Sequence, residues 1–371
     1  MITPGFSVTA TERVLPRLAL DFTTGVLDSR VTVTRALNTA TRVNSSGYVE
    51  TVNANLPRFD YDAVTLLPKG LLIEETRANL LLRSSEFNVS PWTPIGAAIT
   101  PDTATAPDNT LTADTITFSG AGQYILQNVA ITLGVVYTIS FYIRTVTGTS
   151  NIKLVNDGGA SVSSNIPVTN QWTRITFTST SSRTGSAGHG LESAGASSFY
   201  IWGAQLEAGA FATSYIPTTT ISLTRNADVV SMTGTNFSSW YNQSEGAIVC
   251  SVSGGKNSVW AVSYDMGTTG NLAYVRQTSP TAVSSVINGA GSSAASITAD
   301  TAYTTVLAYK INDCAFAING GQLSTFAGTP GTATDLIIGS LNGSFVLNGH
   351  VKKLMFYPQR LTNAECVAFS K

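Results

Sequence analysis

The chain has 371 residues, of which 43% are hydrophobic and only 12% are charged, and its formal net charge is −1. The length predicts roughly two or three folding units, and the hydrophobic content excludes a disordered polypeptide. No basic stripe or polybasic tail is present, which argues against nucleic-acid binding. No apolar run approaches the roughly 20 residues of a membrane-spanning helix, and the N-terminus lacks a secretory signal pattern.

The first segment, residues 1–75, contains short β-like runs but few large apolar residues. It looks too thin to build a core of its own, so the sequence predicts an extended N-terminal arm. Two overlapping interpretations of this arm are open. In the first, the arm packs on other surfaces of the protein. In the second, the arm attaches the chain to a larger assembly and contacts other copies of the chain.

The next segment, residues 76–220, has the periodicity of β-strands. In the sequence TISFYIR, Ile139, Phe141 and Ile143 alternate with polar or amphipathic residues, as in a half-buried strand. Further strands of the same kind, separated by turn signals, are typical of a sandwich or jelly roll.

The sequence YIWGAQLE belongs to the same segment. Strict alternation puts Trp202 and Leu206 on one face of a strand and Gln205 and Glu207 on the other. We therefore expect Trp202 and Leu206 to fill the interior of a sandwich, while Gly203 permits a bend or a close approach of the backbone.

The last segment, residues 221–371, repeats the all-β style. Asn319 and Gly320 stand between two alternating apolar runs, which is a strong local signal for a tight hairpin turn. At the C-terminus, Thr362 and Glu365 have the spacing of a capping box, and this predicts a short helix.

Three cysteines, Cys250, Cys314 and Cys366, are too few and too scattered for a disulfide framework. Alternation places Cys314 on the same face as Phe316 and Ile318, which indicates a small core side chain rather than a reactive thiol. The chain is therefore expected to fold in a reducing compartment. The sequence as a whole predicts an all-β protein. Two antiparallel β-sandwich or jelly-roll domains, 76–220 and 221–371, follow the arm, and a short C-terminal helix ends the chain.

Motifs for catalysis and metal binding are missing from the sequence. There is no nucleophile elbow, phosphate-binding loop or dinucleotide fingerprint. Neither His189 nor His350 has a His or Cys neighbour at zinc-ligand spacing. We predict no catalytic residues, no metal ligands and no cofactor. A calcium ion among Asp265, Asp313 or Asp335 has only weak support, because no Asp-x-Asp-x-Asp-Gly loop is present.

Glycoside hydrolysis needs only two carboxylates that face each other, so the absence of a motif does not by itself exclude it. Asp60 with Asp62, and Glu74 with Glu75, are the densest acidic pairs. We expect them to be solvated carboxylates or partners of nearby arginines.

A glycan platform is the one binding site that the sequence suggests. Flat aromatic rings beside amides and carboxylates are suited to sugars, and such residues gather around a predicted hairpin. The alternative for each ring is a place in the core. The candidate glycan-binding residues are Trp260, Tyr264, Asp265, Asn271 and Tyr274.

The stretches RFDYD, GLLIEETRANLLLRSSEFNVSPW and YIWGAQLEAGAFATSYIPTTTISLTRNADV resemble a module of bacteriophage structural proteins, especially tail-fibre and virion-surface proteins. The resemblance covers most of residues 56–371. It implies a carbohydrate-binding-module-like sandwich in the middle. Through AINGGQ, LIIGS and GHVKKLMFYPQRLTNAE it implies a concanavalin A-like or laminin-G-like lectin domain at the end. It also implies homo-oligomers, commonly trimers, on a phage particle, and it supplies no catalytic set.

These observations lead to one hypothesis with two alternatives. The hypothesis is a non-enzymatic virion protein, a tail fibre or spike, that is made in the host cytoplasm and displayed on the particle. Its expected partners are other virion proteins, its own copies and a host-surface glycan, without nucleic acid or membrane insertion. The alternatives are a capsid decoration or adaptor protein without glycan binding, and a polysaccharide depolymerase.

Overall fold

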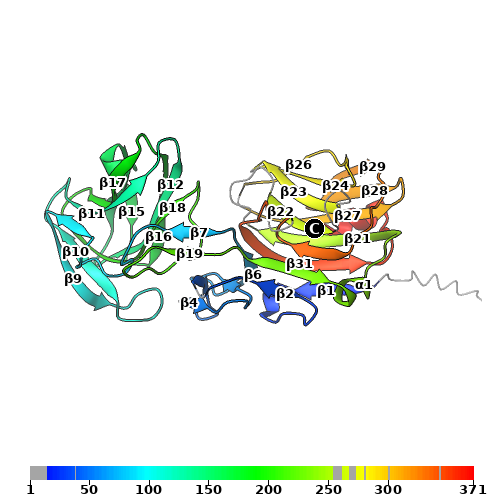
Figure 1. Ribbon diagram of the computed structural model, residues 1–371, viewed down its shortest axis with the longest axis horizontal. Helices are drawn as coiled ribbons and strands as arrows, with labels where there is room; N and C mark the ends of the chain where they lie inside the picture. The colour runs from blue at the N-terminus through cyan, green and yellow to red at the C-terminus, as the bar shows by residue number, and fades with distance from the viewer. Residues whose placement is uncertain are drawn as a thin grey trace, which may run out of the picture.

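The computed structural model describes residues 15–37, 39–253, 261–266, 273–279, 281–299, 301–341 and 344–371. Nearly every regular element in these ranges is a β-strand, and the strands pair in antiparallel fashion. The all-β prediction is confirmed. Figure 1 shows two bodies side by side, which we call the first and the second sandwich.

The first sandwich, on the left in Figure 1, consists of two facing sheets. The β12 sheet runs in the order β16 (Thr173–Thr180), β12 (Val136–Thr145), β18 (Ser197–Ala208), β10 (Ala113–Phe118) and β9 (Ala97–Ala104). The β11 sheet runs β14 (Ser161–Val162), β13 (Ser150–Asn156), β17 (Gly185–Ser193), β11 (Tyr124–Ile131) and β8 (Thr93–Ile95), and β15 (Ile166–Val168) also pairs with β13. A short 3-10 helix, η2 (Asp157–Gly159), follows β13.

The core of the first sandwich follows from the alternation of β12. Ile139, Phe141 and Ile143 are fully buried between the two sheets. Tyr142 and Arg144 lie on the opposite, outer face of the β12 sheet and are half-buried. This strand therefore has the pattern that the sequence predicts.

Strand β18 departs from the predicted alternation at Gly203. Gly203 has a φ of 62°, and the pairing of β18 with β12 shifts register there. Because a bulge reverses which face later residues occupy, Leu206 lies in the sandwich core while Trp202 lies on the outer face of the β12 sheet. The prediction that both side chains fill the interior is wrong for Trp202.

The second sandwich also consists of two facing sheets. The β21 sheet runs β29 (Gln322–Phe326), β28 (Cys314–Ile318), β27 (Ala302–Lys310), β21 (Glu245–Ser253), β31 (Gly349–Tyr357), β6 (Pro68–Ile73) and β5 (Phe59–Tyr61), and β1 (Leu18–Asp21) also pairs with β31. The β23 sheet runs β2 (Thr32–Thr34), β20 (Val229–Thr233), β30 (Asp335–Ile338), β22 (Ala261–Met266), β23 (Ala273–Ser279), β24 (Ala282–Ile287) and β25 (Ala290–Gly291), and β26 (Ala295–Ser296) pairs with β24.

The second sandwich includes most of the segment that was expected to be an arm. Strand β1 pairs with β31, β2 with β20, and β6 with the other end of β31. Leu18, Leu20 and Ile73 are buried in the core between the two sheets. The described part of residues 1–75 is thus not an extended arm. Each of its short strands carries few apolar residues because the C-terminal strands supply most of the core that these strands complete.

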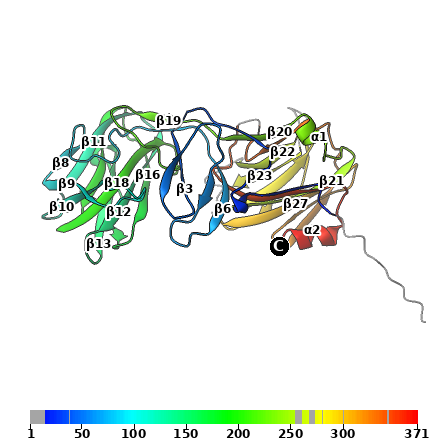
Figure 2. The same cartoon turned by 90° about the horizontal axis from the view of Figure 1, so that it is seen from below.

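Two small strand pairs lie between the sandwiches. One joins β7 (Arg77–Asn79) to β19 (Leu223–Arg225), where the chain enters and leaves the first sandwich. The other is a hairpin of β3 (Ala40–Val43) and β4 (Val49–Val52). Figure 2 shows β3 beside the face of the first sandwich that carries β12, β16 and β18.

The local sequence signals are confirmed. Asn319 and Gly320 both have positive φ in the turn between β28 and β29. Cys314 is fully buried in the second core. Helix α2 (Asn363–Phe369) begins with a complete capping box of Thr362 and Glu365. The other described helices are η1 (Phe22–Thr24) and α1 (Thr235–Ser238). Within the described ranges, no helix is long and apolar enough to cross a membrane.

Candidate functional site

A buried cluster of charges joins the two sandwiches. Asp228 accepts hydrogen bonds from Arg35 Nη1 at 2.8 Å, from the Arg58 guanidinium, and from the Glu74 backbone N at 3.0 Å. Glu74 in turn accepts from Arg58 Nη1 at 2.7 Å and lies 3.0 Å from Arg225 Nη1. The side chains of these three arginines are fully buried. Burial alone would raise the pKa of Glu74, but Arg225 and Arg58 hold it well below its usual value.

The same junction uses the amides of the distinctive sequence motifs. Asn79 donates from Nδ2 to the backbone oxygens of Ala204 and Ile216 at 3.0 and 2.9 Å. Gln205 accepts from the backbone N of Ile216 at 2.7 Å. Ser214 donates to Glu74 from both its backbone N and its Oγ at 2.7 Å. The bonds of Asn79 and Gln205 therefore hold the exit segment against strand β18 of the first sandwich, and the bonds from Ser214 to Glu74 connect this segment to the buried charge cluster.

Each acidic residue that was weighed for glycoside hydrolysis has partners in the protein. Glu74 belongs to the buried cluster, and Glu75 pairs with Arg77. Asp62 accepts from the backbone N of Val64 and Thr65 in its own turn, 3.0 and 2.8 Å away. A register shift after Asp60 interrupts the regular strand alternation that would place Asp60 and Asp62 on one face. Glu74 and Glu75 are therefore partners of arginines, as expected, and Asp62 accepts hydrogen bonds within its own turn. The expectation is wrong for Asp60, which is buried and pairs with His350 and Lys69 instead of an arginine.

A cavity of about 350 Å³ lies beside the buried cluster, between the two sandwiches. The β3–β4 hairpin and the strands β5, β6 and β31 supply one side, and the β12 sheet with the loop 211–215 supplies the other. The residues that line the cavity include Arg42, Asp60, Lys69, Tyr142, Arg174, Phe211, Tyr215 and His350.

On the second-sandwich side of this cavity, Asp60 and His350 form a buried pair. His350 Nε2 lies 2.8 Å from Asp60 Oδ2, and Lys69 Nζ lies 3.3 Å from the same oxygen. Burial by itself raises the pKa of Asp60, yet the hydrogen bond from His350 leaves that pKa below its usual value. Burial also lowers the pKa of His350, although Asp60 opposes this shift. At neutral pH the pair is therefore a carboxylate that accepts a hydrogen bond from a neutral imidazole.

On the first-sandwich side, the outer face of the β12 sheet presents aromatic rings and a guanidinium. Tyr142 stands in register with Arg174 on one neighbouring strand and with Trp202 on the other. The Arg174 guanidinium lies over the Tyr142 ring, 5.4 Å from its centroid, and donates to the Thr213 backbone O at 2.5 Å. Aromatic surface beside oriented hydrogen-bond donors is the combination by which proteins hold polar, ring-shaped ligands.

The aromatic rings of this face are packed together. Trp202 and Tyr215 lie 4.6 Å apart between ring centroids, and Tyr142 and Trp202 lie 5.5 Å apart. The Tyr215 hydroxyl is 2.5 Å from Ser84 Oγ, so this ring is held in place. The half-buried ring of Tyr142 is thus backed by a rigid aromatic layer.

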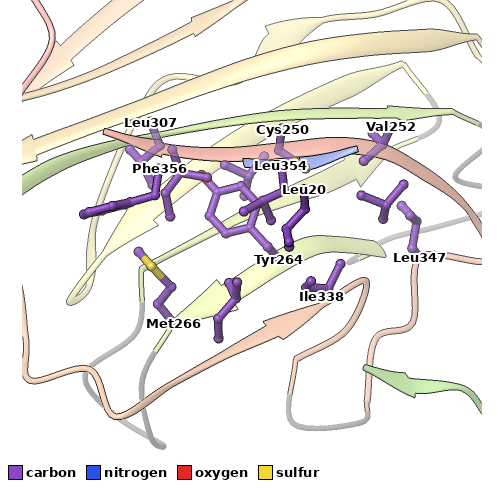
Figure 3. Close-up of a cluster of buried hydrophobic side chains, with 14 of the residues drawn as sticks. Leu20, Cys250, Val252, Tyr264, Met266, Leu307, Ile338, Leu347, Leu354 and Phe356 are labelled. Atoms are coloured by element: carbon purple, nitrogen blue, oxygen red, sulfur yellow. The ribbon is translucent and has the colours of Figure 1, made fainter. Parts of the chain in front are cut away.

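The structure separates the residues of the predicted glycan platform. Tyr264 is fully buried and points into the core of the second sandwich, as Figure 3 shows. Asp265 follows on the opposite face of β22 and stands in register with Tyr274 of β23, which is half-buried. Trp260 and Asn271 lie outside the described residues. Asp265 and Tyr274 therefore lie side by side, and Tyr264 does not reach the surface.

Asp265 is buried in an unusual way for a carboxylate. Among the described residues no side chain hydrogen-bonds to its oxygens, and burial, with a smaller contribution from Asp335, raises its pKa to about 7. Asp313, another residue weighed for calcium, is paired with Arg360 at 2.8 Å. No group of three or more potential metal ligands occurs in the part of the chain that the structure describes.

The sequence did carry a signal for the outer face of the β12 sheet. Tyr142, Arg144 and Arg174 fall on the polar side of two alternating strands, where Thr and Ser are the common residues. Aromatic and arginine side chains at such positions are unusual enough to mark a binding face. The sequence did not indicate that Trp202 lies on the same face, because the face that it occupies depends on the bulge at Gly203.

Fold and cavity together define an all-β protein of two sandwiches with a cavity between them. No protein-family profile matches the chain, and no curated protein matches its sequence.

Among solved structures, the chain is similar to the xylan-binding CBM22-1 domain of Paenibacillus barcinonensis Xyn10C, with 15% identity over 36% of this chain and 94% of that one, at a TM-score of 0.28. It is similar to the CBM2 module of the evolved Dit of Lactobacillus casei BL23 phage J-1, with 13% identity over 37% and 71% of the two chains and a TM-score of 0.23. Domains LG4-5 of the mouse laminin alpha1 chain follow, with 9% identity over 78% and 92% and a TM-score of 0.25. Similarity at this level assigns no function.

Proposed function

We propose that this chain is a non-enzymatic, glycan-binding attachment protein of a bacteriophage particle, a tail fibre or spike. The observation that carries the proposal is the cavity between the sandwiches, which is lined by the Tyr142 ring and the Arg174 guanidinium together with the polar Asp60–His350 pair. A sugar offers an apolar ring face and many hydroxyl groups, so it matches a wall of this composition.

The virion setting is supported by the resemblance of the junction motifs to those of phage structural proteins. In this chain Glu74, from one of these motifs, accepts hydrogen bonds from Ser214 of the TSYIPT loop and pairs with Arg225, and so connects the two sandwiches. A connected body of this kind suits a particle surface. Display of several copies, as a homotrimer beside other virion proteins, strengthens weak sugar contacts through effective concentration.

Binding without cleavage is favoured by the state of the acidic residues. Glu74 is locked between arginines, and Asp60 is held by His350 and Lys69. A glycosidase needs one carboxyl group kept protonated and another free to act. A reducing-end assay with host capsule or lipopolysaccharide tests this part, and release of reducing ends would support the depolymerase alternative.

Glycan binding is tested with the purified chain on an array of bacterial surface polysaccharides, followed by titration of the retained glycan. Tyr142→Ala should weaken binding about tenfold or more, as expected for a central aromatic contact. Tyr124→Ala, which removes a half-buried tyrosine from the opposite β11 sheet, is the matched control and should bind like the wild type. Thermal unfolding of both variants confirms that they are folded. If the wild-type protein bound no polysaccharide on the array, the result would favour the alternative of an adaptor protein without glycan binding.

A further inference from the structure

Arg144 occupies a defined position on the outer face of the β12 sheet. It stands in register with Tyr200 of β18, and Trp172 directly precedes the neighbouring strand β16. The Arg144 guanidinium carbon lies 4.6 Å from the centroid of the Tyr200 ring and 5.2 Å from that of the Trp172 ring. Trp172 is itself fixed by a hydrogen bond from Nε1 to the Thr105 backbone O at 3.1 Å. The guanidinium is therefore held between two rings.

The hydrogen-bonding capacity of this guanidinium is unused. Among the described residues, Arg144 has neither an ion-pair partner nor a hydrogen-bond acceptor, and its Nε is buried. Arg58 and Arg225, by contrast, are buried against carboxylates. An unpaired buried donor costs free energy, and a positioned, unpaired arginine on a half-buried face is suited to an external acceptor.

The surroundings of Arg144 favour an anionic acceptor. A guanidinium keeps its charge and presents its donors as a planar fork that matches carboxylates and sulfates. Arg174 lies on the same face of the neighbouring strand and adds a second positive charge. Among the described residues its guanidinium hydrogen-bonds to the Thr213 backbone O and Ser140 Oγ and pairs with no carboxylate. Next to Tyr200 stands Thr115, whose hydroxyl lies 2.6 Å from that of Thr103. Hydroxyl groups of this kind suit the neutral part of a sugar.

We propose that Arg144, flanked by Trp172 and Tyr200, is a subsite for the anionic substituent of a glycan, a carboxylate or a sulfate ester. This inference rests on the proposed function and narrows it to acidic glycans. The sugar that carries the charge packs against the exposed parts of the two rings, and the rest of the glycan follows the same face toward Tyr142.

The first experiment follows the Arg144 Nε–H signal of the full chain by NMR during titration with glucuronate, sulfate, the methyl ester of glucuronate and glucose. The signal is assigned by its loss in Arg144→Lys. Saturable shifts with glucuronate or sulfate, and none with the ester or glucose, are expected. No shift with either anion, or an equal shift with the ester, would overturn the subsite.

The second experiment uses polysaccharides in matched pairs, one acidic and one carboxyl-reduced or desulfated. Wild type should bind the acidic member about tenfold more tightly, and Arg144→Gln should lose that preference while its affinity for the neutral member is unchanged. Arg144→Lys should keep part of the preference, because it retains the charge but not the fork. Arg30→Gln, which removes a surface arginine paired with Asp28, is the control.

The two experiments separate the two proposals. Equal binding of the acidic and neutral members overturns the subsite and leaves glycan attachment standing. Binding of no polysaccharide at all overturns glycan attachment, and the small-anion titration then decides on its own whether Arg144 receives an anion. Loss of thermal stability in Arg144→Gln without any change in preference shows that the arginine only supports the two rings.

Discussion

Arg225 and Glu74 form a fully buried ion pair, 3.0 Å apart, at the place where the chain leaves and enters the first sandwich. Arg225 also donates to the Glu75 backbone O at 2.5 Å. The Glu74 carboxylate thus holds together segments that are about 150 residues apart in sequence. The relative position of the sandwiches, and with it the cavity between them, depends on this pair.

Replacement of Glu74 by Gln should therefore destabilise the protein strongly. The substitution leaves Arg58 and Arg225 buried with one carboxylate fewer, which costs about 3 kcal/mol in the free energy of unfolding. Urea denaturation measures the change. The control is Glu86→Gln at the exposed pair with Arg83, where less than about 1 kcal/mol is expected. Equal losses in the two variants would show that the buried cluster does not hold the junction.

The N-terminal segment should be essential for the second sandwich. Leu20 of β1 is buried in the second core, so Leu20→Ala should lower the free energy of unfolding by about 3 kcal/mol. Val26, an exposed residue of the same segment, gives the matched control Val26→Ala, with a change below about 0.5 kcal/mol. Deletion of residues 1–75 removes β1, β2, β5 and β6 and should unfold the second sandwich. A truncated chain with an unchanged thermal transition would refute this assignment.

His189 should make stability depend on pH in the acidic range. Its Nδ1 lies 2.6 Å from Asn156 Oδ1, its Nε2 has no hydrogen-bond partner among the described residues, and burial lowers its pKa from 6.5 to about 4. Between these values the unfolded chain binds a proton that the folded chain does not, so stability falls as the pH falls from 6.5 toward 4. The decrease in the free energy of unfolding between pH 6.5 and pH 4 should be about 2 kcal/mol larger in wild type than in His189→Gln. Urea denaturation at several pH values measures it, and parallel pH curves for the two proteins would contradict the prediction.

Asp265 should show the opposite dependence. Its pKa rises from 3.8 to about 7 in the folded state, so the unfolded chain releases the proton first and stability falls as the pH rises through that interval. Asp265→Asn removes the cost of the buried charge and should raise the free energy of unfolding at pH above 7 by about 2 kcal/mol. Asp313→Asn, at an exposed carboxylate, serves as control. Destabilisation by Asp265→Asn at this pH would contradict the prediction, because it would mean that the charged carboxylate accepts stabilising hydrogen bonds in the folded protein.

The parts of the fold that were predicted from the sequence are those that local interactions decide. The alternation around Phe141, the turn at Asn319 and Gly320, and the cap of Thr362 each depend on residues within a few positions of one another. Strand β1 was not predicted, because Leu18 pairs with Phe356 from the far end of the chain. Neither the length nor the composition of a short strand indicates a partner at that distance.

The candidate site was predicted less well, for a physical reason. Aromatic residues serve both cores and binding faces, and only the register of the strand decides between them. Tyr264 falls on the inner face of β22, whereas Tyr142 falls on the outer face of β12. For Trp202 the register itself changes at Gly203. Glu74 and Glu75 do pair with Arg58 and Arg77, which stand near them in the sequence, whereas the partner of Asp60, His350, comes from the far end of the chain and was not expected.

The most direct test of glycan binding at the cavity is an electron-microscopy map of the full chain with a host-surface polysaccharide bound. We expect uncleaved sugar on the outer face of the β12 sheet, with a ring against Tyr142 and hydrogen bonds to Arg174. Sugar located only at the β23 sheet near Tyr274, or a cleaved product held between two free carboxylates, would contradict it.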